Sequence, residues 1–193
     1  MPRRRPWARP PNRPLRRIAF GALAGITLLV VATALWVRLA PSDPADWHVD
    51  PLTAPGTGRA NAWRVGPSGA AGQPLDAAAP VYAVPAAELA RALDAAARAW
   101  PRTEPLARSG DGLHLSYVAR SRVRGFPDYV SVRVLDRDGG TSTLAIYSRA
   151  RFGSSDLGVN RARVEAWLDD LSRRLPAVTP AEKRLEAPLR LAQ

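Results

Sequence analysis

Hydrophobic and polar positions follow three patterns along the chain. Residues 18–37 are uncharged throughout, residues 85–100 and 160–175 repeat apolar side chains every three or four positions, and residues 113–151 alternate apolar with polar positions. Spacing near 3.6 predicts amphipathic helices, and a period of two predicts strands with one buried face. The chain is therefore expected to carry an α+β domain behind one long apolar helix.

The alternating region predicts a meander of strands. We expect strands at 113–122, 130–134 and 141–151, with the sequence DGG at 138–140 as a hairpin turn between the last two. A further short strand at 81–84 gives about four. The expected fold is α+β: a small antiparallel sheet of about four strands with two helices packed on one face, preceded by one transmembrane helix.

The uncharged run at 18–37 fits a membrane span. As a helix its 20 residues would be about 30 Å long, which is the thickness of a bilayer's hydrocarbon core. Residues 1–17 hold seven arginines and no acidic residue, so the positive-inside rule keeps this end in the cytoplasm. We expect a membrane anchor with the remaining chain on the outer side of the membrane.

Two other interpretations of this run stay open. The sequence Ala32-Thr33-Ala34 resembles the cleavage site of a secretory signal, although the apolar run continues beyond it. A buried helix of a soluble protein would have the same composition. The arginine cluster beside an apolar run indicates topology and contact with anionic lipid heads, and it argues against binding of nucleic acid.

Composition divides the chain further and removes several chemistries. The predicted segments are a basic tail at 1–17, the transmembrane helix at 18–37, a linker rich in Pro, Gly and Ala at 38–79, the α+β domain at 80–175 and a tail at 176–193. The formal net charge of +11 comes mostly from the first tail. The chain has no cysteine, which excludes disulfides and thiolate metal sites. No cofactor is expected.

Two long motifs resemble a known family. FPDYV at 126–130 and SRARFGSSDLGVNR at 148–161 are similar to sequences of the bacterial family called domain of unknown function 1499 (DUF1499). The resemblance extends over about residues 80–175. It implies a small envelope or membrane-associated protein and brings no reaction or ligand with it.

The second motif is a strand-to-helix corner rich in small polar residues. Glycines permit backbone conformations closed to other residues, and short polar side chains bond nearby N–H groups. We expect Asn160 to cap the helix and Asp156 to meet its positive end. The predicted corner residues are Gly153, Ser155, Asp156, Gly158 and Asn160.

Arginines near this corner form the candidate binding site. The period-two pattern places strand arginines on the non-aliphatic sheet face, and two more begin the following helix. Converging guanidinium groups bind carboxylate or phosphate. The alternative is a solvated arginine face paired with Asp128, Asp136 and Asp156. The candidate residues are Arg120, Arg122, Arg149, Arg151, Arg161 and Arg163.

Catalytic patterns are weak. Ser148 or Ser155 with Asp156 gives a conceivable hydrolytic pair, but no base is evident to activate the serine. His48 and His114 lie far apart in sequence and lack companions at metal-ligand spacing. We therefore expect no catalytic or metal site.

The predicted function is a membrane-anchored, non-catalytic periplasmic domain that binds an anionic lipid, glycan or protein partner. The alternative is a hydrolase acting on an anionic envelope substrate. The tryptophans of the linker, Trp47 and Trp63, are expected to pack on the flank of the domain, with a ligand-facing role as the other interpretation.

Overall fold

The computed structural model divides the chain into two units, Met1–Ala40 and Pro41–Gln193. It describes residues 13–57, 60–69, 72, 74–122, 125–176 and 178. Most of the two predicted tails, at 1–17 and 176–193, lies outside these residues, as does part of the turn predicted before residue 128.

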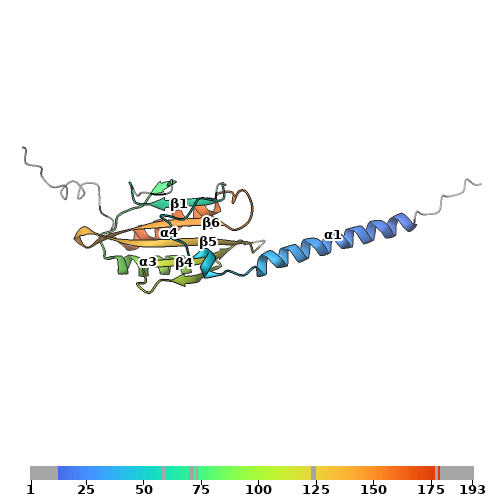
Figure 1. The fold of residues 1–193 in the computed structure, drawn as a ribbon, viewed down its shortest axis with the longest axis horizontal. Helices are drawn as coiled ribbons and strands as arrows, with labels where there is room; N and C mark the ends of the chain where they lie inside the picture. The colour runs from blue at the N-terminus through green and yellow to red at the C-terminus, as the bar shows by residue number, and fades with distance from the viewer. Residues whose placement is uncertain are drawn as a thin grey trace, which may run out of the picture. The chain divides into compact units, whose positions relative to one another are not determined.

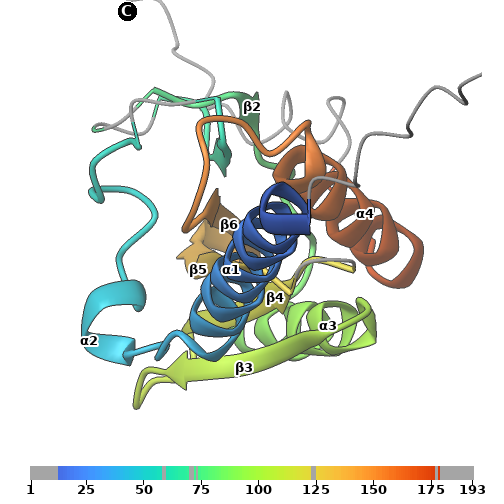
Figure 2. The ribbon, with the colours of Figure 1, turned by 90° about the vertical axis from the view of Figure 1, so that its right-hand side faces the viewer.

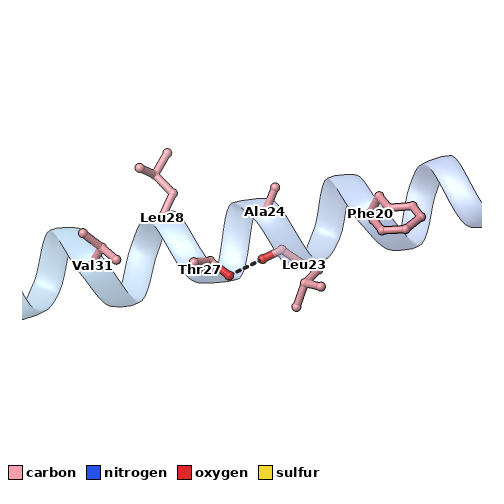
Figure 3. Close-up of a pocket in the computed structure, with 6 residues that line it drawn as sticks. All are labelled: Phe20, Leu23, Ala24, Thr27, Leu28 and Val31. Atoms are coloured by element: carbon pink, nitrogen blue, oxygen red, sulfur yellow. Dashed lines mark hydrogen bonds between the residues drawn. The ribbon is translucent and has the colours of Figure 1, made fainter.

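The first unit contains one helix, α1 (Arg13–Leu39). Within it, residues 16–39 are long and apolar enough to cross a membrane, as the sequence predicted for 18–37. Figure 3 shows Phe20, Leu28 and Val31 projecting from this single helix, whose one polar side chain in view, Thr27, donates to the carbonyl of Leu23 at 2.9 Å. Because that hydroxyl is satisfied within the helix, it adds little polarity to the apolar surface.

The second unit is built on a sheet of six strands in the order β2-β1-β6-β5-β4-β3 (Figure 1). Neighbouring strands are antiparallel except β1 and β2, which are parallel. The strands are β1 (Ala62–Gly66), β2 (Ala77–Ala78), β3 (Thr103–Arg108), β4 (His114–Arg120), β5 (Pro127–Arg137) and β6 (Thr141–Ala150). The short 3-10 turn η1 (Asp138–Gly140) joins β5 to β6, where the sequence predicted a hairpin.

One face of the sheet carries the hydrophobic core. Leu115, Val132 and Ile146 lie on this face, each less than 2% exposed. Helices α3 (Ala86–Ala99) and α4 (Val159–Arg174) pack against it and add buried side chains such as Leu93 and Trp167. Figure 2 shows both helices on the same side of the sheet. The period-two and period-3.6 patterns therefore predicted the two inner faces correctly.

The predicted sheet of about four antiparallel strands was too small and too regular. Three strands were missed: β1 and β2 fall inside the predicted linker, and β3 is an edge strand interrupted by Pro105 with a shift in register beside it. Proline lacks the N–H that a central strand needs, so its position at the edge is the one that a sheet tolerates. The strand predicted at 81–84 is only an isolated bridge between Tyr82 and Ser142.

The predicted linker at 38–79 contains more structure than its composition indicates. Residues 41–57, which we call the strap, include the short helix α2 (Pro44–Trp47) and run along the sheet face opposite α3 and α4 (Figure 2). The strap is followed by β1, which pairs with β6. The second unit is thus a three-layer arrangement of helices, sheet and strap.

Candidate functional site

The strap is held on the sheet by aromatic stacking. The Trp47 ring lies 3.8 Å from the Tyr129 ring with an interplanar angle of 13°. Ser42, also in the strap, shares a hydrogen bond of 2.8 Å with the Tyr129 hydroxyl. Trp47 therefore does not lie at the flank of the domain, as the sequence suggested, but on its polar sheet face. Trp63 is in β1 and packs partly buried against the core.

Backbone carbonyls of the strap receive hydrogen bonds from side chains of the sheet. A loop laid across a sheet has no ladder to join, so its carbonyl groups need donors from elsewhere. The bonds run from Arg151 to Pro41 (2.6 Å), Ser131 to Trp47 (3.1 Å), His114 to Val49 (3.0 Å), Arg64 to Pro51 and to Ala54 (2.9 Å), and Tyr147 to Pro55 (3.2 Å). The polar residues that alternate along β1, β4, β5 and β6 are thus the donors that fix the strap.

Arginines and aromatic rings alternate across this face. The Arg64 guanidinium lies 3.7 Å from the centroid of the Tyr147 ring, and that of Arg149 lies 4.8 Å from the same centroid. The Trp47 ring is 5.1 Å from Arg149 and 5.5 Å from Arg151. These are cation–π distances, and the rings partly compensate for the loss of water around the cations. Within the described residues, none of the three arginines forms a salt bridge.

Arg149 is the least satisfied of these cations. Its side chain is 7% exposed, and its single hydrogen bond to the strap, from Nη2 to the Trp47 carbonyl, is long at 3.4 Å. Its Nη1 is buried and has no hydrogen-bond partner in the described part of the chain. Burial lowers the pKa of Arg149 from its ordinary value, and the charge of Arg64 lowers it further. A guanidinium nevertheless stays protonated in proteins, so the charge remains uncompensated.

A cavity of about 220 Å³ opens beside Arg149, between the strap and β6. Its lining combines two cations, two aromatic rings and small polar or apolar groups. The lining residues are Trp47, Pro55, Thr57, Asn61, Tyr147, Arg149, Ala150 and Arg151. A concave site with convergent polar groups is the usual form of a binding pocket, and this one is positive.

His48 of the strap and His114 of β4 form a pair at another point of this face. The rings of His48 and His114 stack with centroids 3.7 Å apart, and Nδ1 of His48 shares a hydrogen bond of 2.8 Å with the Ser116 hydroxyl. Burial lowers the pKa of both imidazoles. The sequence analysis placed these two residues far apart, because nothing in 41–57 indicated that the segment returns to β4.

The six candidate arginines do not share one site. Arg149 and Arg151 lie together at the cavity, whereas Arg120 is at the end of β4 and Arg122 is exposed beyond it. Arg161 is exposed and pairs with Glu165 at 2.7 Å. Arg163 is buried on the opposite side of the sheet. Arg64, which the sequence analysis did not select, joins Arg149 and Arg151 on the polar face.

The strand-to-helix corner is organised by Asp156 rather than by Asn160. The N-cap of α4 is Gly158, whose φ of 80° lies in the left-handed region that glycine adopts without strain. The Asp156 carboxylate accepts from the backbone N–H of Gly158 (3.1 Å) and of Asn160 (2.7 Å). Ser155 accepts from the N–H of Leu157 at 3.2 Å. The expectation that Asn160 caps the helix was therefore wrong, and Asp156 supplies that function.

Asn160 instead belongs to a buried polar cluster between α4 and the sheet. Arg163 donates to Asp128 at 2.8 Å, to Asn160 Oδ1 at 2.6 Å and to Ser148 at 3.0 Å. The Ser148 hydroxyl donates to Asn160 Oδ1 at 2.6 Å, and the serine is fully buried. Asp128 was expected on the solvated face, but it faces the helices. Burial raises its pKa although Arg163 favours the charged form.

The polar side chains of the corner bond the backbone and one another. Because Ser148 is buried and its proton is directed to an amide oxygen, the geometry gives it no general base. Among the described residues, no group of three or more His, Asp or Glu side chains is arranged to hold a metal ion. Among the described residues, Arg149 and Asn61 combine a buried, unpartnered polar atom with a position in the lining of the positive cavity beneath the strap.

Comparison with known proteins places this strapped α+β domain in a family. The family model described as "Protein of unknown function (DUF1499)" matches residues 46–171, which is more than half of the chain, and the chain belongs to this family. The match begins in α2 and not near residue 80, where the resemblance was expected to start. Most of the strap and all of β1 are therefore part of the family domain. Neither the curated proteins nor the solved structures gave a match.

The Arg163–Asp128 pair generates a stability prediction. Replacing Asp128 with alanine leaves a buried guanidinium without its counterion, which costs about 3–5 kcal/mol of unfolding free energy. Denaturant unfolding of the full chain in detergent measures this change. As a control, Glu165→Ala breaks the exposed pair with Arg161 and should cost no more than about 1 kcal/mol. Similar small losses in both variants would contradict the structural role of the cluster.

The histidine pair generates a pH prediction. Both imidazoles have a pKa below the ordinary value in the folded chain, so acid protonates the unfolded chain first and stability is lost as the pH falls below about 6.5. Arg133 opposes protonation of both rings, whereas Asp50 and Asp111 favour protonation of His114. The free energy of unfolding of the full chain, measured with denaturant from pH 8 to pH 5, should fall by at most about 1.4 kcal/mol per pH unit for each histidine. His114→Gln should flatten this slope, and an unchanged slope would refute the assignment.

Proposed function

We propose that this DUF1499 protein is an inner-membrane protein that presents its α+β domain to the periplasm, where the domain binds an anionic envelope component or partner. The anchor is α1, and the binding site is the positive cavity lined by Arg149 and Arg151. The family assignment carries no activity, so the proposal depends on the residues of this chain.

The membrane part of the proposal is supported by α1 and by the charges around it. The apolar side chains of Phe20, Leu28 and Leu29 in this helix are each more than 60% exposed. Such a surface is costly in water and favourable in lipid. The seven arginines at 1–17 are expected to remain on the cytoplasmic side. A cleaved signal sequence would also carry a single apolar helix near the N-terminus, and the topology experiment below distinguishes the two.

The binding part rests on one observation: Arg149 is buried with its Nη1 unbonded in the described structure and forms no salt bridge there. An isolated charge in a low-dielectric site is unfavourable, and proteins normally pair it. An anionic group entering the cavity would supply the missing counterion and accept from Nη1. Arg151 lies at the same cavity and adds a second positive charge.

The hydrolase alternative receives less support from the geometry. It needs a serine that is both accessible and activated. Ser148 is buried in the cluster around Arg163, whereas Ser155 is exposed but accepts a backbone hydrogen bond in the corner. Binding without turnover is therefore the function that the arrangement favours.

The anchor and its orientation can be tested by reporter fusion. We expect alkaline phosphatase fused after Gln193 to be active, since that enzyme folds only outside the cytoplasm, and the full-length fusion to stay in the membrane fraction after alkaline extraction. Replacing the arginines of 1–17 with glutamine should reduce the activity, because the orientation signal is lost. A fusion recovered in soluble, shortened form would identify a cleaved signal instead.

Anion binding can be tested by thermal unfolding of the full chain in detergent. Phosphate, glucuronate or acetate at about ten times its Kd should stabilise the folded chain by about 1.4 kcal/mol relative to chloride of equal ionic strength, or about 3–6 °C in Tm. Arg149→Met should abolish the increment. Arg133→Met, which changes an arginine of the same face outside the cavity, should retain it. An increment that survives in R149M would exclude this site.

A further inference from the structure

The size of the cavity limits what enters it. Its volume of about 220 Å³ is below the ~300–1,000 Å³ of pockets that enclose a whole small molecule. A single end group fits such a space, with the rest of the ligand outside. The inference developed here rests on the proposed function and specifies the chemistry of that end group.

Two residues that line the cavity each carry a buried polar atom without a partner in the described structure, and the two atoms are of opposite kind. Nη1 of Arg149 is a donor, and Oδ1 of Asn61 is an acceptor. Asn61 is 1% exposed, and its orientation is fixed because its Nδ2 donates to the Gly153 carbonyl at 2.8 Å. An unsatisfied buried polar atom costs about 1–3 kcal/mol. A ligand that satisfies both atoms therefore presents an anionic acceptor next to a hydrogen-bond donor.

We propose that the cavity binds the free carboxyl terminus of a peptide. The terminal carboxylate accepts from Nη1 of Arg149, and the N–H of the terminal residue donates to Oδ1 of Asn61. The terminal side chain then lies against the apolar part of the lining, which Trp47, Pro55 and Tyr147 provide. A peptide end carries these three features on neighbouring atoms, as the small cavity requires.

Other anions match the lining less well. An acidic sugar brings several hydroxyl groups, each of which needs a partner when buried, whereas the buried atoms of the lining that lack a partner in the described structure are one donor and one acceptor. A phosphate group fully ionised has no N–H or O–H to offer Asn61. Either anion would neutralise Arg149. The phosphate would leave Oδ1 of Asn61 without a donor, and the sugar would leave some of its own hydroxyl groups without partners.

The test varies the ligand on the unaltered full chain in detergent, so that folding of a variant is not in question. Acetyl-Ala-Ala with a free carboxyl end should bind with a Kd on the order of 1 mM, followed by tryptophan fluorescence because Trp47 lines the cavity. The C-terminal amide lacks the charge, and the analogue N-methylated at the terminal residue lacks the donor. The Kd of each analogue should exceed that of the free acid by a factor of about ten or more.

Arginine variants locate the binding. Arg149→Met should reduce the affinity for the free acid to that of the amide. Arg133→Met is the matched control and should leave the affinity unchanged, because Arg133 shares the sheet face but not the cavity. Equal binding of acid and amide, or of the free acid to wild type and R149M, would overturn the inference.

The outcomes separate this inference from the proposed function. If glucuronate or phosphate binds in an Arg149-dependent way and the peptide acid does not, peptide recognition is refuted while anion binding is retained. If the N-methylated peptide binds as well as the parent, the role of Asn61 is refuted. If no anion binds, both proposals fail.

Discussion

A stretch of backbone lies across the polar face of the sheet, and its carbonyl groups must find donors there. The residues of the strap accept hydrogen bonds from Arg64, His114, Ser131, Tyr147 and Arg151. If apolar side chains covered this face, the sheet would not need to present donors there. If water covered it, water would supply the hydrogen bonds. The polar face is therefore neither a core nor an open surface, and this explains why its strands alternate aliphatic residues with arginine, tyrosine, serine and histidine.

On the other face of the sheet, the C-terminal end of β6 meets a different constraint. There the strand turns into α4 through a corner where Asp156 caps the helix, and the buried cluster of Arg163, Asp128, Ser148 and Asn160 ties the first turn of that helix to β5 and β6. Asn160 also donates to the backbone of Asn61, which lines the cavity. The corner thus positions one wall of the candidate site from the far side of the sheet.

Local pattern was sufficient for the elements that bury one regular face. The alternation through Leu144, Ile146 and Ser148 identified the inner face of β6, and the repeat through Val164 and Trp167 identified that of α4. It failed where pairing is remote or irregular. Trp47 contacts Arg149 across 102 positions of sequence, and the strap has no periodicity that would indicate its course.

The candidate site was predictable in composition but not in arrangement. Period two correctly placed Arg149 and Arg151 on the polar face. The hydrophobic pattern groups Asp128 with Val130 and Arg163 with Trp167 on the inner faces, but it could not reveal that the two charges pair there. Nor could it select Arg64 or Asn61, since both lie in a segment whose proline and glycine content suggested a linker. A signal was present in Trp47 and Trp63, because tryptophan is seldom left in a solvated linker.

The strap requires donors, but it does not require positive charge. Neutral tyrosine, serine and histidine side chains already serve several of its carbonyl groups, and asparagine or glutamine would serve the others without the cost of burying a cation. Three arginines nevertheless lie against the rings of Tyr147 and Trp47, and in the described structure no carboxylate pairs with them. They are Arg64, Arg149 and Arg151. Their aromatic neighbours moderate the charge and cannot neutralise it. We propose that an anion from outside the chain compensates this excess charge, and a carboxylate beside an N–H is the anion that would also satisfy Asn61.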